Sequence, residues 1–97
     1  MEFKKMGVKD KAVQNYKKYV KGNENVSDEI CKLKILRNWY AGTQTSEVTV
    51  RYGNLIIRKH PNRDLIIRVF NSETQSGYVN LEIKKELNIL WNIKGDN

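Results

Sequence analysis

The sequence contains one cysteine, one histidine and one proline, and this scarcity excludes several classes of protein. A lone cysteine, Cys31, cannot form an intramolecular disulfide, so the chain is not a disulfide-stapled secreted scaffold. One histidine and one cysteine do not supply the ligands of a zinc site, and we expect neither a metal nor a cofactor. The simplest role for Cys31 is to fill space on a buried helical face.

Long apolar runs are also missing. No stretch approaches the roughly 20 apolar residues that a membrane-spanning helix needs, and the N-terminus lacks the apolar core of a signal peptide. The chain has 97 residues, of which 39% are hydrophobic, so it can bury one core but has no room for two. These features predict one small domain over residues 1–97 that is soluble and cytoplasmic.

Positive charge is what the sequence has in excess, with a formal net charge of +7 and a pI near 9.6. Residues 1–22 hold seven lysines, and residues 47–71 hold four of the five arginines. A positive balance of this size favours polyanionic partners. An AT-rich genome would enrich both lysine and asparagine, of which the chain has eleven, but it would not explain the arginines.

Apolar residues recur at helical spacing in the N-terminal part of the chain, which predicts a helical region over about residues 8–41. The first helix is expected to run from about Val8 to Gly22, because glycine followed by asparagine is a helix stop signal. Lysines surround its apolar stripe. Lys17 and Lys18 lie on this solvated side, where they would contact a phosphate backbone.

A second helix is expected to begin after Ser27, a good N-cap residue, and to end at Gly42. Its apolar residues form one broad stripe, and we expect Lys34 and Arg37 to point away from the core. The polar run at residues 43–46 is expected to form a loop.

Residues 47–84 predict a four-stranded antiparallel meander, because short β-rich runs alternate with turn residues. Gly53-Asn54 is a two-residue hairpin signal between two such runs. This turn sets Tyr52 opposite Leu55 and fixes which side chains share a face.

Two further strands are expected after the next turn. The register that keeps charged side chains out of the core places Ile66 and Arg68 outward. The fourth strand would span Tyr78–Ile83 with Lys84 outward, and residues 85–94 favour a short C-terminal helix over a further strand. The predicted fold class is therefore α+β, with two N-terminal helices, a four-stranded antiparallel meander and a short C-terminal helix.

The outward face of this meander combines arginines with aromatic and aliphatic residues. Its predicted members are Arg51, Ile56, Arg58, His60, Ile66, Arg68, Phe70, Tyr78 and Lys84. The planar guanidinium group of arginine binds phosphate or carboxylate through parallel N–H donors. A face of this composition is therefore typical of a surface that contacts a partner. A helix packed over this face would instead bury its aliphatic residues and leave the arginines at the edge.

The first functional hypothesis is a small basic protein that binds nucleic acid and performs no catalysis. Arginine and lysine would hold phosphates, while aromatic rings would stack on unpaired bases. The predicted contacts are Arg51, Arg58, Arg68, Lys84, Lys17 and Lys18 to phosphate, and Phe70 and Tyr78 to bases.

The alternative is a protein-binding inhibitor or regulator of the kind that phages and mobile elements encode. In that case Ile56, Ile66 and Phe70 would form the centre of an interface with an arginine rim, and the partner would present an acidic surface. The free edges of the sheet would also allow two copies of the chain to pair as a homodimer.

A third hypothesis is a metal-independent endoribonuclease. Such cleavage needs a base, an acid and a cation, and Glu47, His60 and Arg58 would supply them in that order. The hairpin register sets Glu47 across from His60, and Arg68 would join Arg58 as a phosphate clamp. Two helices followed by an antiparallel sheet is an arrangement that resembles small bacterial RNA-cleaving toxins.

Overall fold

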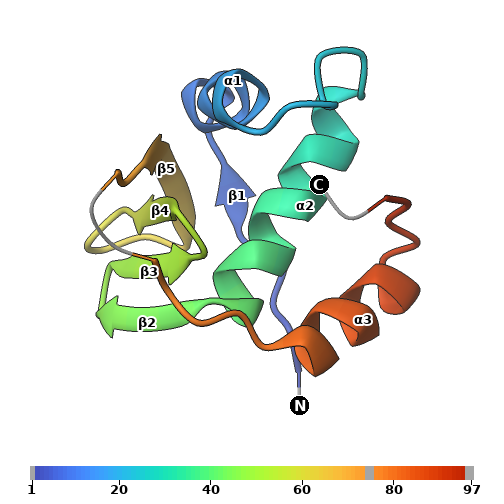
Figure 1. The fold of residues 1–97 in the computed structure, drawn as a ribbon. Helices are drawn as coiled ribbons and strands as arrows, with labels where there is room; N and C mark the ends of the chain where they lie inside the picture. Colours follow the sequence, from blue (N-terminus) through green and yellow to red (C-terminus); the bar gives the residue numbers. More distant parts are fainter. Residues whose placement is uncertain (1, 74–75, 96–97) are drawn as a thin grey trace.

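The computed structural model describes residues 2–73 and 76–95. Within these residues the chain forms three helices and one five-stranded sheet, which confirms the predicted α+β class. The elements in order are β1 (Gly7–Val8), α1 (Asp10–Tyr19), α2 (Asp28–Ala41), β2 (Thr43–Ser46), β3 (Thr49–Tyr52), β4 (Leu55–Lys59), β5 (Leu65–Asn71) and α3 (Leu81–Leu90) (Figure 1).

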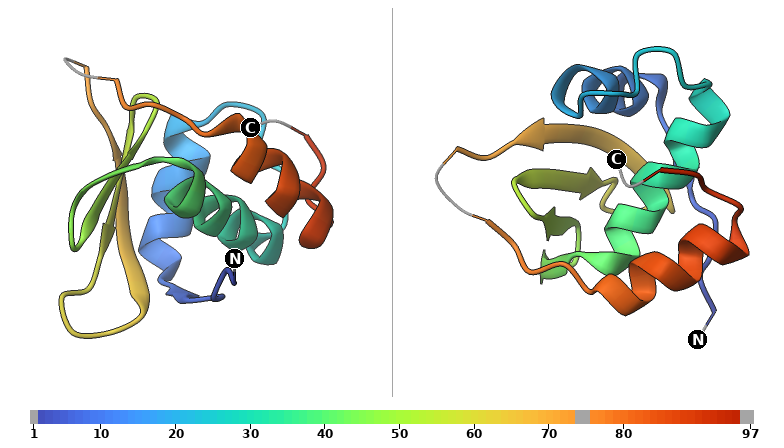
Figure 2. Two further views of the ribbon diagram at one scale, coloured as in Figure 1. Left: turned by 90° about the horizontal axis from the view of Figure 1, so that it is seen from below. Right: turned by 45° about the vertical axis from the view of Figure 1, so that its right-hand side comes forward.

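The strands lie in the order β1-β5-β4-β3-β2, and all neighbours are antiparallel except the parallel pair β1 and β5. Helix α1 packs on β5, α2 packs on β3, and α3 packs on α2. Figure 2 shows the three helices on the same side of the sheet. No helix of the described residues therefore covers the opposite face of the sheet.

An N-cap hydrogen bond and strand pairing determine where the two N-terminal helices begin. Ser27 is the N-cap of α2, and its hydroxyl accepts a hydrogen bond from the Ile30 amide at 3.3 Å, as the sequence predicted. Helix α1 begins at Asp10 and not at Val8, because Val8 pairs with Ile66 in the sheet. The predicted start of α1 was therefore wrong by two residues.

The β3–β4 hairpin has the predicted register. Tyr52 pairs with Leu55 and Val50 pairs with Ile57 across the turn. Gly53 in this turn has a φ of 56°, a left-handed conformation that glycine adopts without a steric penalty. Val50 and Ile57 are both buried on the face that the helices cover.

A β-bulge corrects the predicted facing of β5. Arg58 pairs with Arg68, but the next pair is Lys59 with Ile66, so Ile67 is the extra residue. One extra residue reverses the alternation of side chains beyond it. Ile66 was predicted to face outward, and instead it is fully buried in the core.

The predicted fourth strand over Tyr78–Ile83 was wrong, because these residues lead into and begin α3. The Asn80 side chain accepts hydrogen bonds from the amides of Glu82 and Ile83, both at 3.1 Å. The first backbone amides of a helix have no partner within the helix, and these two bonds satisfy them. Residues 81–83 therefore form the start of a helix, although their apolar residues alternate as in a strand. The predicted C-terminal helix is present, but it begins four residues before residue 85.

The loop predicted at residues 43–46 is the edge strand β2, which pairs with β3. All four of its residues are exposed, so the strand has no buried face and no apolar alternation to reveal it. β1, at the other edge, is two residues long. The two edges of the sheet are therefore short.

The core lies between the sheet and the first two helices, and it extends to the segment after α3. Its buried members are Met6, Val8, Ala12, Val13, Tyr16, Cys31, Ile35, Leu36, Leu55, Ile57, Ile66, Val69, Leu87, Trp91 and Ile93. Cys31 is fully buried, as predicted, and this burial raises the pKa of its thiol. None of the helices in residues 2–73 and 76–95 has the length and apolar character required to cross a membrane.

Candidate nucleic-acid interface

The uncovered face of the sheet brings three arginines and one phenylalanine together. Strand pairing sets Thr49 opposite Arg58, Arg51 opposite Ile56, Ile56 opposite Phe70, and Arg58 opposite Arg68. Paired residues in a ladder point to the same face, so these six side chains form one surface. We call it the arginine face, and its residues are Thr49, Arg51, Ile56, Arg58, Arg68 and Phe70.

Phe70 supports two of these arginines. Its ring centroid lies 5.5 Å from the guanidinium carbon of Arg58 and 5.9 Å from that of Arg68. Both distances fall within the range of a cation–π contact. The ring therefore holds two guanidinium groups side by side, although their like charges repel each other.

The arginine face lacks a carboxylate at its ladder positions. No ion pair in the described part of the chain involves Arg51, Arg58 or Arg68. Arg58 and Arg68 are exposed, whereas Ile56 beside them is only 8% exposed. The exposed guanidinium groups therefore have no counter-charge within residues 2–73 and 76–95 and can accept an external anion.

Arg51 is held more tightly than the other two arginines. Its Nη1 donates a hydrogen bond to the Ser72 hydroxyl at 3.4 Å. The segment after β5 also crosses it, since the Gly77 amide donates to the Gly53 carbonyl oxygen at 2.8 Å. Arg51 is half-buried as a result, and it lies at the margin of the arginine face.

Gly77→Ala is expected to destabilise the protein by about 1–3 kcal/mol through overpacking. A Cβ at this position would lie 2.5 Å from the Arg51 Cβ and 2.7 Å from its carbonyl oxygen. The measurement is equilibrium urea unfolding. Ser76→Ala, next to it and exposed, is the matched control and should change stability by less than about 0.5 kcal/mol. Equal stabilities of the two variants would show that the segment can shift without cost.

Two residues that the predicted fourth strand would have added to this face lie elsewhere, because residues 78–83 form no strand. Tyr78 is 74% exposed in the segment before α3, and its carbonyl oxygen accepts a hydrogen bond from the Thr43 hydroxyl at 2.9 Å. Lys84 lies on α3 with its ammonium 5.7 Å from the centroid of the Tyr52 ring. Neither side chain joins the strand ladder that forms the arginine face.

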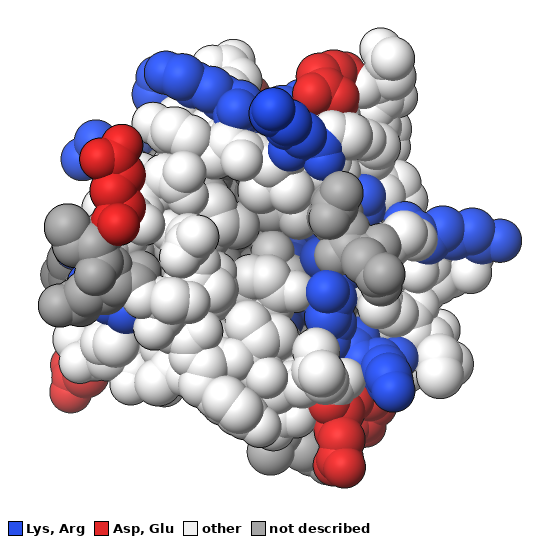
Figure 3. All heavy atoms as spheres, in the orientation of Figure 1, with Lys and Arg blue, Asp and Glu red and all other residues white. Residues whose placement is uncertain are grey.

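The lysines of α1 form a separate basic surface, and Figure 3 shows Lys and Arg side chains gathered along this helix. Lys17 donates a hydrogen bond to the Asp28 carboxylate at 2.9 Å, which raises the pKa of Lys17 and lowers that of Asp28. The Lys18 ammonium lies 5.4 Å from the centroid of the Tyr19 ring. Because α1 packs on the helix-covered side of the sheet, α1 and the arginine face lie on opposite sides of the sheet.

Glu47 and His60 are not joined by a hydrogen bond or ion pair within the described ranges. Glu47 lies exposed in the turn between β2 and β3, and the last ladder pair of the hairpin is Thr49 with Arg58. His60 uses its Nδ1 atom to accept a hydrogen bond from the Asn62 amide at 3.0 Å. This contact gives His60 a role in shaping the β4–β5 turn.

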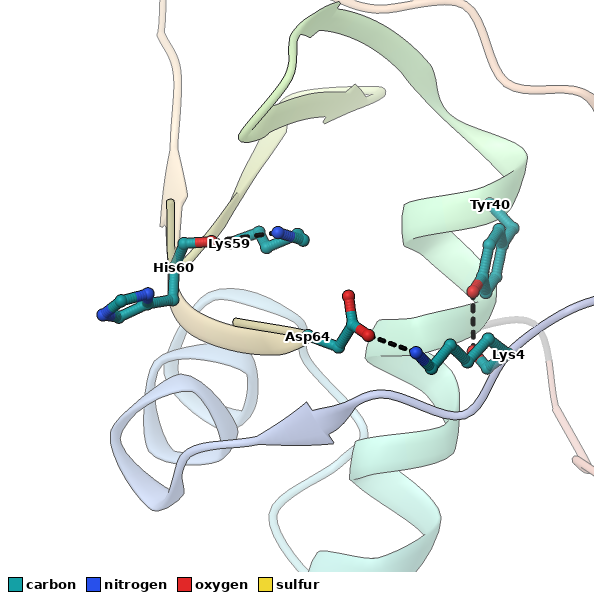
Figure 4. A network of polar contacts seen from close by, with 5 residues as sticks. All are labelled: Lys4, Tyr40, Lys59, His60 and Asp64. Carbon is teal, nitrogen blue, oxygen red and sulfur yellow. Dashed lines mark hydrogen bonds and ion pairs between the residues drawn. The ribbon is translucent and has the colours of Figure 1, made fainter. Parts of the chain in front are cut away.

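A polar network beside this turn ties the N-terminal segment to the sheet (Figure 4). Lys4 forms an ion pair with Asp64, and this contact lowers the pKa of the Asp64 carboxyl. The Tyr40 hydroxyl donates to the Lys4 carbonyl oxygen at 2.6 Å, and the Lys59 ammonium donates to the His60 carbonyl oxygen at 3.0 Å. The His60 ring points away from Asp64, so the network does not assemble an acid–base pair around the imidazole.

Two cations that the sequence analysis placed outside the core are buried in α2. Arg37 is fully buried and Lys34 is 4% exposed, so the prediction that they point away was wrong. The reason is that α3 packs on α2, while α1 and the sheet cover its other sides. The apolar residues of α2 were predicted to form one broad stripe, but Ile30, Ile35 and Leu36 lie on different sides of the helix. This spread was the missed signal of such coverage, because a helix covered on one side shows one stripe.

No protein-family model matches the chain, and comparisons with curated proteins and with solved structures give no match. The described residues also contain no group of three or more His, Cys, Asp or Glu side chains that could hold a metal ion. The function is therefore inferred from the geometry and charge of the arginine face.

Proposed function

We propose that this protein binds nucleic acid through the arginine face and acts as a binding module without catalysis. The observation that supports this most is the pairing of Arg58 with Arg68 over the Phe70 ring, with no carboxylate partner among the described residues. Guanidinium groups bind phosphate oxygens by charge and by a fork of N–H donors. The net charge of +7 would draw any nucleic acid toward the protein.

The geometry favours contact with the phosphate backbone over reading of base sequence. Arginines on neighbouring strands lie side by side on a sheet face that no helix covers in the described part of the chain. A β-sheet face of this kind is too broad to enter a groove of a nucleic-acid duplex, where base edges are read. Phe70 is half-buried, so its ring supports the arginines first and offers only part of its area to a base. We therefore propose binding with little sequence preference.

The structure weakens the support for the protein-binding alternative. That hypothesis needs Ile56, Ile66 and Phe70 as the apolar centre of an interface. Ile66 belongs to the core, and Ile56 is 8% exposed, so of these three residues the half-buried Phe70 ring is the one that remains accessible on the arginine face.

The test is fluorescence anisotropy with labelled single- and double-stranded RNA and DNA at two salt concentrations. We expect micromolar or tighter binding that weakens as salt rises, with log K falling against log salt by about 0.9 for each phosphate contacted on a duplex and about 0.7 on a single strand. Absence of binding at low salt would contradict the proposal. The RNA should remain intact on a denaturing gel afterwards.

Cleavage of the RNA in the presence of a chelator would instead favour the endoribonuclease hypothesis. In that case activity should be lost in both Glu47→Ala and His60→Ala. Cleavage that persists in both variants would indicate a contaminating nuclease.

A further inference from the structure

Helix α2 carries two positive charges into the interior of the protein. Arg37 is the largest of the fully buried side chains, and Lys34 lies one turn before it at 4% exposure. Taking charged groups out of water is costly unless opposite charges and hydrogen bonds compensate. The partners of these two cations therefore show whether their positive charges are compensated inside the protein.

The partners that the structure places around them are neutral amides. Arg37 donates from Nε to the Asn38 side-chain oxygen and from Nη1 to that of Asn88, both at 3.0 Å. The Lys34 ammonium donates to the Asn23 side-chain oxygen at 2.7 Å. None of the ion pairs within residues 2–73 and 76–95 includes either cation.

The groups left without a partner here are hydrogen-bond donors. Nη2 of Arg37 is buried and makes no hydrogen bond. The Tyr16 hydroxyl accepts from the Asn38 side-chain nitrogen at 3.4 Å, and its own proton has no acceptor in the described structure. Among the described residues, this cluster of spare donors and excess positive charge has no negatively charged acceptor.

The two cations differ in how they can relieve this imbalance. Burial, together with the charge of Arg37, lowers the pKa of the Lys34 ammonium, so its charged form is disfavoured. Arginine keeps its charge in proteins and has no such route. Arg37 is therefore the cation whose charge requires a compensating anion.

We propose that Arg37 forms the centre of an internal oxyanion site between α1, α2 and α3, with Nη2 and the Tyr16 hydroxyl as donors. A phosphate, a sulfate or the carboxylate of a small molecule has the required charge and acceptor oxygens. Nη2 is enclosed, so the proposal requires that the contact of Asn88 with Arg37 opens at the α2–α3 interface to admit the anion. This site does not depend on the arginine face, which lies on the other side of the sheet.

The experiment is thermal unfolding of the full chain, followed by tryptophan fluorescence, at constant ionic strength with chloride replaced by phosphate, sulfate or acetate. We expect a saturable rise in Tm of roughly 5 °C with the preferred anion. A response to phosphate and sulfate alone would assign a tetrahedral oxyanion, whereas an equal response to acetate would assign a carboxylate.

Two variants separate the site from general salt effects, since sulfate and phosphate stabilise folded proteins in general. Arg37→Met removes the guanidinium and should lose the saturable part of the rise. Asn88→Asp places a carboxylate next to Arg37, so it should raise Tm in chloride and reduce the response to added anion. It also remains informative if Arg37→Met does not fold.

The double variant Arg58→Ala with Arg68→Ala is the control and should keep the part of the response that Arg37→Met loses, which separates this site from the proposed nucleic-acid surface. The proposal is overturned if the wild type shows no saturable rise. It is also overturned if Arg37→Met, or Asn88→Asp where the first does not fold, responds as the wild type does.

Discussion

Ile66→Ala is expected to destabilise the protein by about 2–5 kcal/mol, because it removes a fully buried side chain from the core. Ile66 pairs with Val8 of β1 on one side and with Lys59 of β4 on the other. A cavity at this position lies between two strands and the helices above them, where little relaxation can fill it. The measurement is equilibrium urea unfolding, with the midpoint and slope both fitted.

Ile67→Ala is the matched control, since it makes the same chemical change one residue away. Ile67 is the extra residue of the bulge and is half-buried, so its truncation should cost about 1 kcal/mol or less. The difference between the two variants therefore tests the bulge directly. A larger loss of stability for Ile67→Ala than for Ile66→Ala would indicate that β5 has no bulge and that Ile66 lies on the arginine face.

The double variant Arg58→Ala with Arg68→Ala is expected to weaken nucleic-acid binding by about 10- to 100-fold at low salt, because both phosphate contacts of the Phe70 platform disappear. The slope of log K against log salt should become shallower by about 2, one unit for each lost phosphate contact. Affinity is measured by the same anisotropy titration, and circular dichroism checks that the variant keeps its fold.

The double variant Lys11→Ala with Lys18→Ala is the charge-matched control. Both lysines are exposed on α1, on the helix-covered side of the sheet, and their removal lowers the net charge by the same amount. If binding depends on the arginine face, this control should lose far less affinity than the arginine variant. Equal losses in both would mean that affinity follows total charge and not the Arg58–Arg68 pair.

The sequence by itself determined the local features of this protein. The Ser27 cap, the Gly53-Asn54 turn and the pairing of Tyr52 with Leu55 depend on residues near one another in the chain. Short-range sterics and hydrogen bonds specify such features with little help from the rest of the fold. The fold class follows from the same signals, because helical spacing and alternating apolar runs occupy different parts of the sequence.

The candidate site was determined in part by these local signals. Hairpin parity places Arg51 and Arg58 on the face away from the core, and the predicted register of the next strand adds Arg68 and Phe70. The observed ladder has all four residues on this face. Tyr78 was misplaced, because an alternating run before α3 reads as a strand unless the cap at Asn80 is given more weight.

Only the tertiary structure decided which polar and apolar residues are buried. The bulge at Ile67 turns Ile66 inward, and it is favourable because Val8 then packs beside Ile66 from a strand that joins β5 from the distant N-terminus. Helix α3 covers α2 and encloses Arg37, although the local pattern of α2 assigns this residue to solvent. Both outcomes depend on contacts between segments far apart in the chain, and local spacing does not identify which distant segment makes such a contact.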